Sequence, residues 1–147
     1  MRYPRGADNS VFDKSALNTE YTHVSGQRTD VLCISYGRIY DNLYQASRRA
    51  KEAGMPCDLL KLTRIFPLSD AVVELASTYQ HVLFLEEAYY YGGISQLLGD
   101  LLLERGFRGT YRRVAPRHIC RRLLRISMER WAVGACHYQD YAAGGKT

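Results

Sequence analysis

Two adjacent carboxylates, Glu86 and Glu87, come shortly before a glycine pair, Gly92 and Gly93, with a tyrosine triplet at 89–91 between them. Paired carboxylates can perform general acid and base catalysis, and a glycine-rich helix start can bind an anion. Neighbouring side chains of an extended segment point in opposite directions, however, so adjacency does not make the two carboxylates converge. We therefore predict that these four residues shape a loop that meets another domain or subunit, and that none is catalytic.

A second set of candidate ligands lies near the end of the chain. One residue separates His118 from Cys120, and Cys136 is adjacent to His137. Paired zinc ligands usually have two to four residues between them, so these spacings disfavour a zinc site. We predict no metal site in this chain and expect its scattered cysteines to be reduced, buried thiols.

Phosphate-binding loops have recognisable glycine spacings that this sequence lacks. Gly37 stands alone after the first apolar run, so neither a glycine-lysine phosphate loop nor a three-glycine dinucleotide motif is present. Gly99 and Asp100 resemble part of a diphosphate-binding motif, but they lie inside a leucine-rich periodic segment without a second glycine. Neither Ser35 nor Cys33 has the sequence context of a nucleophile elbow. The sequence therefore predicts no cofactor site within this chain.

Strands and helices are predicted to alternate along the chain and to position these residues. Apolar runs typical of strands lie at residues 31–35, 57–62, 81–85 and 110–114. Between them, apolar side chains recur at helical spacing on three faces, formed by Ile39, Leu43, Ala46 and Ala50, by Val72, Leu75, Ala76 and Tyr79, and by Ile94, Leu97, Leu98, Leu101 and Leu102. Gly54 is the expected stop of the first helix and Ser69 the N-cap of the second. This alternation predicts right-handed βαβ units and a mostly parallel sheet.

The composition is typical of one globular domain, with 147 residues of which 46% are apolar and 24% charged. The longest apolar runs, Val82–Leu85 and Ala132–Cys136, are far shorter than the roughly 20 residues of a membrane helix. Arg2 directly follows Met1, and no apolar region comes behind it. These features argue against a secretory signal and predict a cytoplasmic protein that does not associate with membranes.

The net charge of +5 is concentrated in one segment. Residues 112–130 contain seven arginines and one acid, so this segment carries +6 and the remainder of the chain −1. Proteins that bind nucleic acid usually spread basic side chains over a folded face. The confined charge therefore disfavours nucleic acid as a partner.

Four motifs occur in the order and at the separations found in one group of enzymes. The chain reads RYPRG at residues 2–6, DVLCISYG at 30–37, LKLTRIFPLSD at 60–70 and VLFLEEAYYYGG at 82–93. The last three resemble the first strand, a Pro-Leu turn and the Glu-Glu…Gly-Gly segment of transketolase C-terminal domains. The first resembles the end of the middle domain of 1-deoxy-D-xylulose-5-phosphate synthases, and it favours that branch of the family.

The resemblance implies an α/β fold of three α/β/α layers, with a mostly parallel sheet and an antiparallel strand at one edge. It places a transketolase C-terminal-like domain at residues 30–116. Residues 1–29 would be the end of a preceding pyrimidine-binding domain and a linker, and residues 117–147 an Arg-rich divergent tail. Arg2 matches an arginine that lies near the substrate phosphate in the family, so the resemblance implies a substrate-binding role for it in a full enzyme.

The resemblance also implies an activity for the full enzyme. It would use thiamine diphosphate and Mg²⁺ to join pyruvate and glyceraldehyde 3-phosphate into 1-deoxyxylulose 5-phosphate, releasing CO₂, at the entry to isoprenoid precursor synthesis. The family's cofactor motifs belong to its other two domains. This chain alone is therefore expected to be inactive, to hold no cofactor, and to serve packing and subunit contacts with those domains in a homodimer.

Two other functions stay open at this stage. The chain could be the C-terminal part of a split transketolase or of a β-type subunit of a 2-oxoacid dehydrogenase, with a partner chain supplying the cofactor site. A basic-tailed nucleic-acid-binding module is the alternative from a different class, and the confined charge argues against it.

Overall fold

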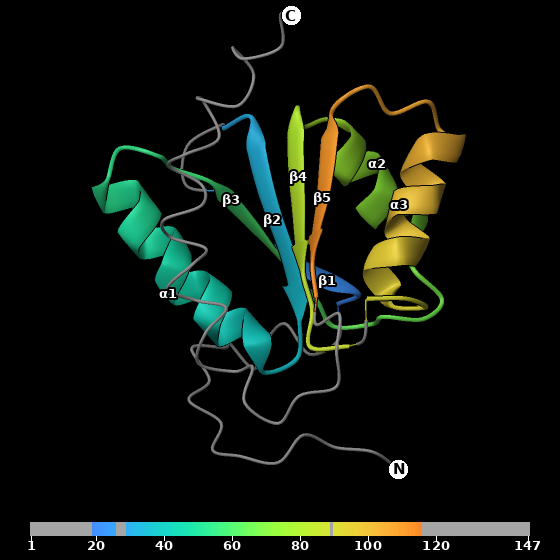
Figure 1. Ribbon diagram of the computed structural model, residues 1–147, viewed down its shortest axis with the longest axis horizontal. Coiled ribbons are helices and arrows are strands. Elements are labelled where there is room, and N and C mark those ends of the chain that lie inside the picture. Colours follow the sequence, from blue (N-terminus) through green and yellow to red (C-terminus); the bar gives the residue numbers. More distant parts are fainter. Residues whose placement is uncertain (1–18, 26–28, 89, 116–147) are drawn as a thin grey trace, which may run out of the picture.

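The computed structural model describes residues 19–25, 29–88 and 90–115, which build one mixed β-sheet flanked by helices (Figure 1). Its strands are β1 (Tyr21–Val24), β2 (Val31–Tyr36), β3 (Asp58–Leu62), β4 (His81–Leu85) and β5 (Thr110–Val114). Their order across the sheet is β1-β3-β2-β4-β5. β1 runs antiparallel to β3, and the other neighbouring pairs are parallel. This arrangement confirms the predicted mostly parallel sheet with an antiparallel edge strand.

The helices lie on both faces of the sheet and make three layers. α1 (Ile39–Glu52) covers one face, and α2 (Asp70–Ser77) and α3 (Ile94–Glu104) pack side by side on the other (Figure 1). The larger core, on the α2–α3 face, contains Leu32, Ile34, Leu60, Leu62, Val72, Val73, Ala76, Val82, Phe84, Leu98 and Leu102. The smaller core, on the α1 face, contains Cys33, Tyr40, Leu43 and Leu59. The predicted α/β/α layers are therefore confirmed.

The edge strand β1 lies inside the stretch that the sequence indicates to be a linker. Tyr21 pairs with Leu62 and Val24 with Leu59. The linker expectation is therefore wrong at these residues. β1 has only four residues and none of them is fully buried. A short, half-buried edge strand leaves no apolar alternation for sequence analysis to detect.

The buried faces of the helices differ in part from the predicted ones. α1 buries Tyr40, Leu43 and Ser47, so only Leu43 of the predicted face is fully buried. The reason is that the ring of Tyr40 supplies the apolar surface that packs on the sheet. α3 buries Leu98 and Leu102 as predicted, together with a serine at its first turn.

The ends of the helices also follow from local chemistry. Gly54 has φ of 78° just beyond α1, which confirms it as the stop of that helix. Ser69 is the N-cap of α2 in an extended conformation, but its side chain makes no capping hydrogen bond. The prediction of Ser69 as the N-cap residue is confirmed, whereas the side-chain hydrogen bond that a cap usually makes is absent.

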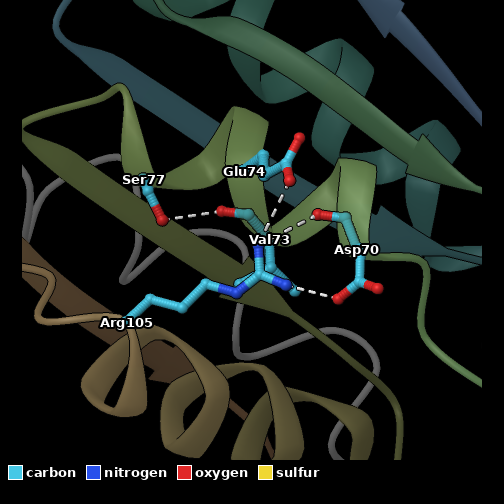
Figure 2. Close-up of polar contacts among 5 residues, drawn as sticks. All are labelled: Asp70, Val73, Glu74, Ser77 and Arg105. Atoms are coloured by element: carbon cyan, nitrogen blue, oxygen red, sulfur yellow. Dashed lines mark hydrogen bonds and ion pairs between the residues drawn. The ribbon is translucent and has the colours of Figure 1, made fainter.

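Arg105, at the C-terminal end of α3, connects that helix to α2 (Figure 2). Its guanidinium bonds to the carboxylate of Asp70, lies 3.5 Å from the carbonyl oxygen of Asp70, and lies 3.7 Å from a carboxylate oxygen of Glu74. Within α2, the Ser77 hydroxyl donates to the Val73 carbonyl at 2.7 Å. Both acidic side chains are mostly exposed, so each ion pair contributes at most about 1 kcal/mol. Arg105 thus connects α2 and α3 at the surface and adds little to the stability of the domain.

In the described part of the chain, no helix combines the length and the apolar content that crossing a bilayer requires.

Candidate functional site at the carboxyl edge of the sheet

The loops after β2, β3 and β4 lie at the carboxyl edge of the parallel strands, where open α/β sheets usually bind their ligands or partners. The loop after β4 runs from Glu86 to Gly93 and leads into α3. Its first residue remains attached to the sheet, because the Glu86 N–H donates to the Val114 carbonyl at 3.0 Å. This hydrogen bond to β5 therefore fixes the backbone at the first residue of the predicted site.

Glu86 is buried, with 1% of its surface exposed. It continues the inward-facing alternation of β4, in which Val82 and Phe84 are also buried. One carboxylate oxygen accepts a hydrogen bond from the Ser95 hydroxyl, and the other accepts one from the Tyr36 hydroxyl at 3.2 Å. Since a buried carboxylate needs such donors, these bonds make Glu86 a junction between β2, β4 and α3.

Glu87 has a different environment and a different partner. Its carboxylate lies 3.6 Å from the Arg38 guanidinium, and 35% of the side chain is exposed. The two adjacent carboxylates therefore bind to separate groups, one in the interior and one at the surface. The two carboxylates therefore do not converge as an acid and base pair. This agrees with the prediction that the loop meets another domain or subunit.

Gly92 and Gly93 are required for two distinct reasons. Gly92 has φ of 76°, a conformation that L side chains rarely adopt. A Cβ at Gly93 would lie 2.2 Å from one carboxylate oxygen of Glu86. Gly93 is also the N-cap residue of α3, and the Gly92 N–H donates to the Gln96 side-chain oxygen at 3.0 Å. The glycine pair thus lets the helix start directly on the buried carboxylate.

Tyrosine hydroxyls near this site stay protonated. Burial, followed by the nearby charge of Glu86, raises the pKa of Tyr36 far above its usual range. Burial also raises the pKa of Tyr111, whose hydroxyl donates to the Ser95 carbonyl at 2.5 Å. Both side chains are therefore hydrogen-bond donors at neutral pH: Tyr36 donates to Glu86, and Tyr111 donates to the first turn of α3.

Aromatic and arginine side chains continue the site to the surface. The Arg113 guanidinium lies 4.3 Å from the centre of the Tyr90 ring and donates to the Tyr90 carbonyl at 3.4 Å. The Tyr90 and Tyr91 rings pack edge to face at 5.2 Å, and Tyr91 is 66% exposed. Tyrosine and arginine are enriched in the cores of protein interfaces. Tyr89, the first residue of the triplet, lies outside the described residues.

The loop after β3 adds apolar surface at the same edge. Phe66 is 74% exposed and Ile65 is 37% exposed. Sequence analysis missed both as site residues, although an apolar pair directly before Pro67 in a turn was the available signal. We define the edge surface as Ile65, Phe66, Tyr90, Tyr91 and Arg113.

The chain enters the domain beside this loop. The Glu20 carbonyl accepts hydrogen bonds from the Thr63 and Arg64 N–H groups at 2.9 and 3.0 Å, and the Glu20 carboxylate pairs with the Arg64 guanidinium. β1 then runs antiparallel to β3, away from the carboxyl edge. The polypeptide upstream of β1 therefore joins the domain at the same edge as the edge surface.

Other residues that sequence analysis considered have structural environments or lie outside the described part. A Cβ at Gly99 would lie 2.8 Å from the Tyr111 ring, so this glycine makes room for packing inside α3. Ser35 is fully buried in β2. Within residues 19–25, 29–88 and 90–115, no group of three His, Cys, Asp or Glu side chains could hold a metal ion. Outside the described residues lie Arg2, His118, Cys120, Cys136 and His137.

Comparison with known proteins identifies the family. The model of the transketolase C-terminal domain family matches residues 20–129, and the chain belongs to this family. The match includes β1 and extends past residue 116 into the Arg-rich segment, so it is wider than the predicted limits of 30–116. The fold and the family agree with each other and with the motifs at 30–37, 60–70 and 82–93.

Individual relatives are more distant. A 1-deoxy-D-xylulose-5-phosphate synthase from Kocuria rhizophila is 26% identical over 116 residues, which cover 72% of this chain and 17% of that protein. A split gene transketolase, solved as an inactive beta4 tetramer, has a TM-score of 0.69 at 16% identity. The match covers 78% of this chain and 38% of the transketolase chain. A 2-oxoglutarate:ferredoxin oxidoreductase from Magnetococcus marinus has a TM-score of 0.53 at 15% identity. The match covers 69% of this chain and 18% of the oxidoreductase chain. These two structures share the fold.

Proposed function

We propose that this chain is the C-terminal domain of a thiamine-diphosphate-dependent 1-deoxy-D-xylulose-5-phosphate synthase and is itself non-catalytic. The full enzyme would join pyruvate and glyceraldehyde 3-phosphate, release CO₂ and supply isoprenoid precursor synthesis in the cytoplasm. The observation that carries this choice within the family is the 26% identity to the Kocuria rhizophila synthase over 116 residues. The RYPRG motif at residues 2–6 supports the same branch.

The role of this chain would be to supply a rigid contact surface. The hydrogen bonds of Glu86 hold the start of α3, and Arg113 holds Tyr90, so the edge surface is ordered before any partner binds. Its partners would be the preceding domain of the same polypeptide and the second subunit of a homodimer. The entry of the chain at Glu20 beside the loop after β3 supports the preceding domain as the first of these.

The cofactor would be held by other parts of the enzyme. The described residues offer no side-chain cluster suited to Mg²⁺. They also lack the glycine spacing of a phosphate loop. We therefore assign no step of the reaction to these residues. Arg2, whose RYPRG motif resembles one with an arginine near the substrate phosphate in the family, is the single residue that we propose to touch substrate.

The test is product analysis with the full-length protein that contains this chain. It is supplied with thiamine diphosphate, Mg²⁺ and two substrate pairs in separate reactions: pyruvate with glyceraldehyde 3-phosphate, and a ketose phosphate with an aldose phosphate. The proposal predicts 1-deoxyxylulose 5-phosphate and CO₂ from the first pair. Ketol transfer between the sugars with no product from the first pair would contradict it.

A split transketolase is the second candidate, favoured by the likeness to the split gene transketolase structure. In that case this chain would act only after mixing with a separate chain that carries the cofactor site. The same product analysis, with and without such a chain, distinguishes the two candidates.

A further inference from the structure

Four side chains near the amino end of β3 form a hydrogen-bonded cluster. The Asp58 carboxylate accepts hydrogen bonds on Oδ2 from the Tyr79 hydroxyl at 2.8 Å and from the Ser25 hydroxyl at 3.3 Å. His23 Nε2 lies 3.0 Å from the Tyr79 hydroxyl oxygen. We define the Asp58 cluster as His23, Ser25, Asp58 and Tyr79. It joins β1 and the residue after it to β3 and to the segment between α2 and β4.

The direction of each hydrogen bond follows from the protons that are present. Burial, followed by the hydrogen bond to Asp58, raises the pKa of Tyr79 well above its ordinary value, so its hydroxyl stays protonated at neutral pH. Tyr79 donates its only hydroxyl proton to Asp58, so the tyrosine oxygen accepts from His23 Nε2–H. His23 and Ser25 are therefore the two donors that attach the β1 segment to the cluster.

Asp58 is incompletely satisfied while β1 is in place. Its residue surface is 1% exposed, and in the part of the chain that the structure describes its Oδ1 has no hydrogen-bond partner. A buried carboxylate oxygen without a donor is energetically costly. If β1 moves away, the bond from Tyr79 to Asp58 remains, because neither residue belongs to β1, and water reaches Oδ1. Hydration of Asp58 therefore offsets part of the cost of separating β1.

Apolar burial holds β1 less firmly than it holds the central strands. Tyr21 packs against the larger core, whereas Val24 is 43% exposed, and none of the four β1 residues is fully buried. In β2, by contrast, the four residues at 32–35 are all buried. β1 also lies at the edge of the described sheet and pairs with β3. Elements with few buried apolar contacts open at a lower free energy than the core of a protein.

We propose that β1 opens as a unit while the rest of the sheet stays folded, and that the Asp58 cluster keeps it closed. In the same event the Glu20 carbonyl would separate from the Thr63 and Arg64 N–H groups. The upstream polypeptide enters the domain through β1, so opening would detach it from the sheet without unfolding the core. This inference concerns the chain itself and does not rest on the proposed function.

The experiment is amide hydrogen exchange of the full 147-residue chain, followed by NMR at several low urea concentrations. We expect the amides of residues 21–24, with those of Thr63 and Arg64, to exchange at least roughly tenfold faster than the slowest amides of β2 and β4. Their rates should also depend less on urea, because opening of β1 exposes less surface than global unfolding. Equal protection and equal urea dependence in β1 and the central strands would overturn the proposal.

Two variants test the role of the Asp58 cluster. His23→Phe combined with Ser25→Ala removes both donors of the β1 segment and keeps the bond from Tyr79 to Asp58, so exchange of the β1 amides should accelerate by roughly tenfold or more. The matched control is Thr22→Val in the same strand. The Thr22 hydroxyl is buried and has no hydrogen-bond partner among the described residues, so this change should not accelerate exchange. Equal acceleration by the control would refute the role of the cluster.

A mild core variant separates the opening of β1 from global unfolding. Ile34→Val removes one buried methyl group from β2, so the slowest core amides should exchange about two- to tenfold faster. The β1 amides should keep their rates, because the core stays folded when β1 opens and the closed and open forms are weakened equally. Acceleration of β1 amides by the same factor as the core would show that β1 opens only when the whole domain unfolds.

Discussion

Replacing Gly93 by alanine isolates the contact between the start of α3 and the buried carboxylate. Gly93 has φ of −80° and ψ of 170°, which alanine adopts without strain. The new methyl group, however, would lie 2.2 Å from one Glu86 oxygen and 2.8 Å from its carboxyl carbon. The Glu86 carboxylate must therefore move away from its position between Ser95 and Tyr36.

The size of the effect follows from the hydrogen bonds that Glu86 makes. Losing one of its two hydrogen bonds should lower the free energy of unfolding by about 1.5–3 kcal/mol, since the acceptor is charged. Alanine also restricts the unfolded chain, which offsets about 0.4–1 kcal/mol. We expect Gly93→Ala to lower the unfolding free energy by about 0.5–2.5 kcal/mol, measured by urea denaturation followed by circular dichroism.

A double-mutant cycle gives the decisive control. Glu86→Ala removes the carboxylate that the new methyl group would strike, so Gly93→Ala should have little effect in that background. Gly92→Ala is the matched neighbour, because its Cβ would meet open space and only its φ of 76° opposes the change. Its effect should therefore be the same with and without Glu86. Equal destabilisation by Gly93→Ala in both backgrounds would refute the proposed contact.

Four further predictions follow from other parts of the molecule. Gly99→Ala should lower the unfolding free energy by about 1–3 kcal/mol in urea denaturation, because its Cβ would lie 2.8 Å from the Tyr111 ring; an unchanged midpoint would show that the ring moves freely. Stability should fall as pH rises above about 10, because unfolding lets Tyr36 and Tyr111 ionise at their ordinary pKa whereas the folded chain raises it, and Tyr36→Phe should reduce this slope. Phe66→Ser should leave the urea midpoint of the isolated chain unchanged but weaken association with the rest of the enzyme in sedimentation, and the converse result would place Phe66 in the core. Calorimetric titration of the isolated chain with thiamine diphosphate and Mg²⁺ should give no binding heat, and saturable micromolar binding would contradict the proposed division of roles.

Much of the sheet was predictable because its strands are short, apolar and buried. The predicted runs at 81–85 and 110–114 coincide with β4 and β5, and the run at 31–35 is one residue shorter than β2. β1 was not predictable, since its four residues become a strand only by pairing with β3. Local pattern determines the central strands, whereas tertiary pairing determines the edge.

The candidate site was predictable in its location and less so in its contacts. The sequence indicates that Glu86 and Glu87 diverge, and the alternation with Val82 and Phe84 could have shown that Glu86 is the inward one. The close approach of Gly93 to that carboxylate depends on how α3 packs on β4, which no local pattern encodes. The partners of Glu86 could not be predicted for the same reason, because they come from β2 and α3.

The central claim is that Glu86 and Glu87 support packing and subunit contacts and take no part in catalysis. The most direct test measures both properties in the same variants. Glu86→Gln and Glu87→Gln are placed in the full-length enzyme, and turnover is measured per assembled enzyme alongside thermal unfolding and the subunit dissociation constant. The account predicts weaker stability or association, with turnover of the assembled enzyme unchanged within about twofold. Loss of turnover with folding, assembly and cofactor affinity intact would contradict it and make the pair catalytic.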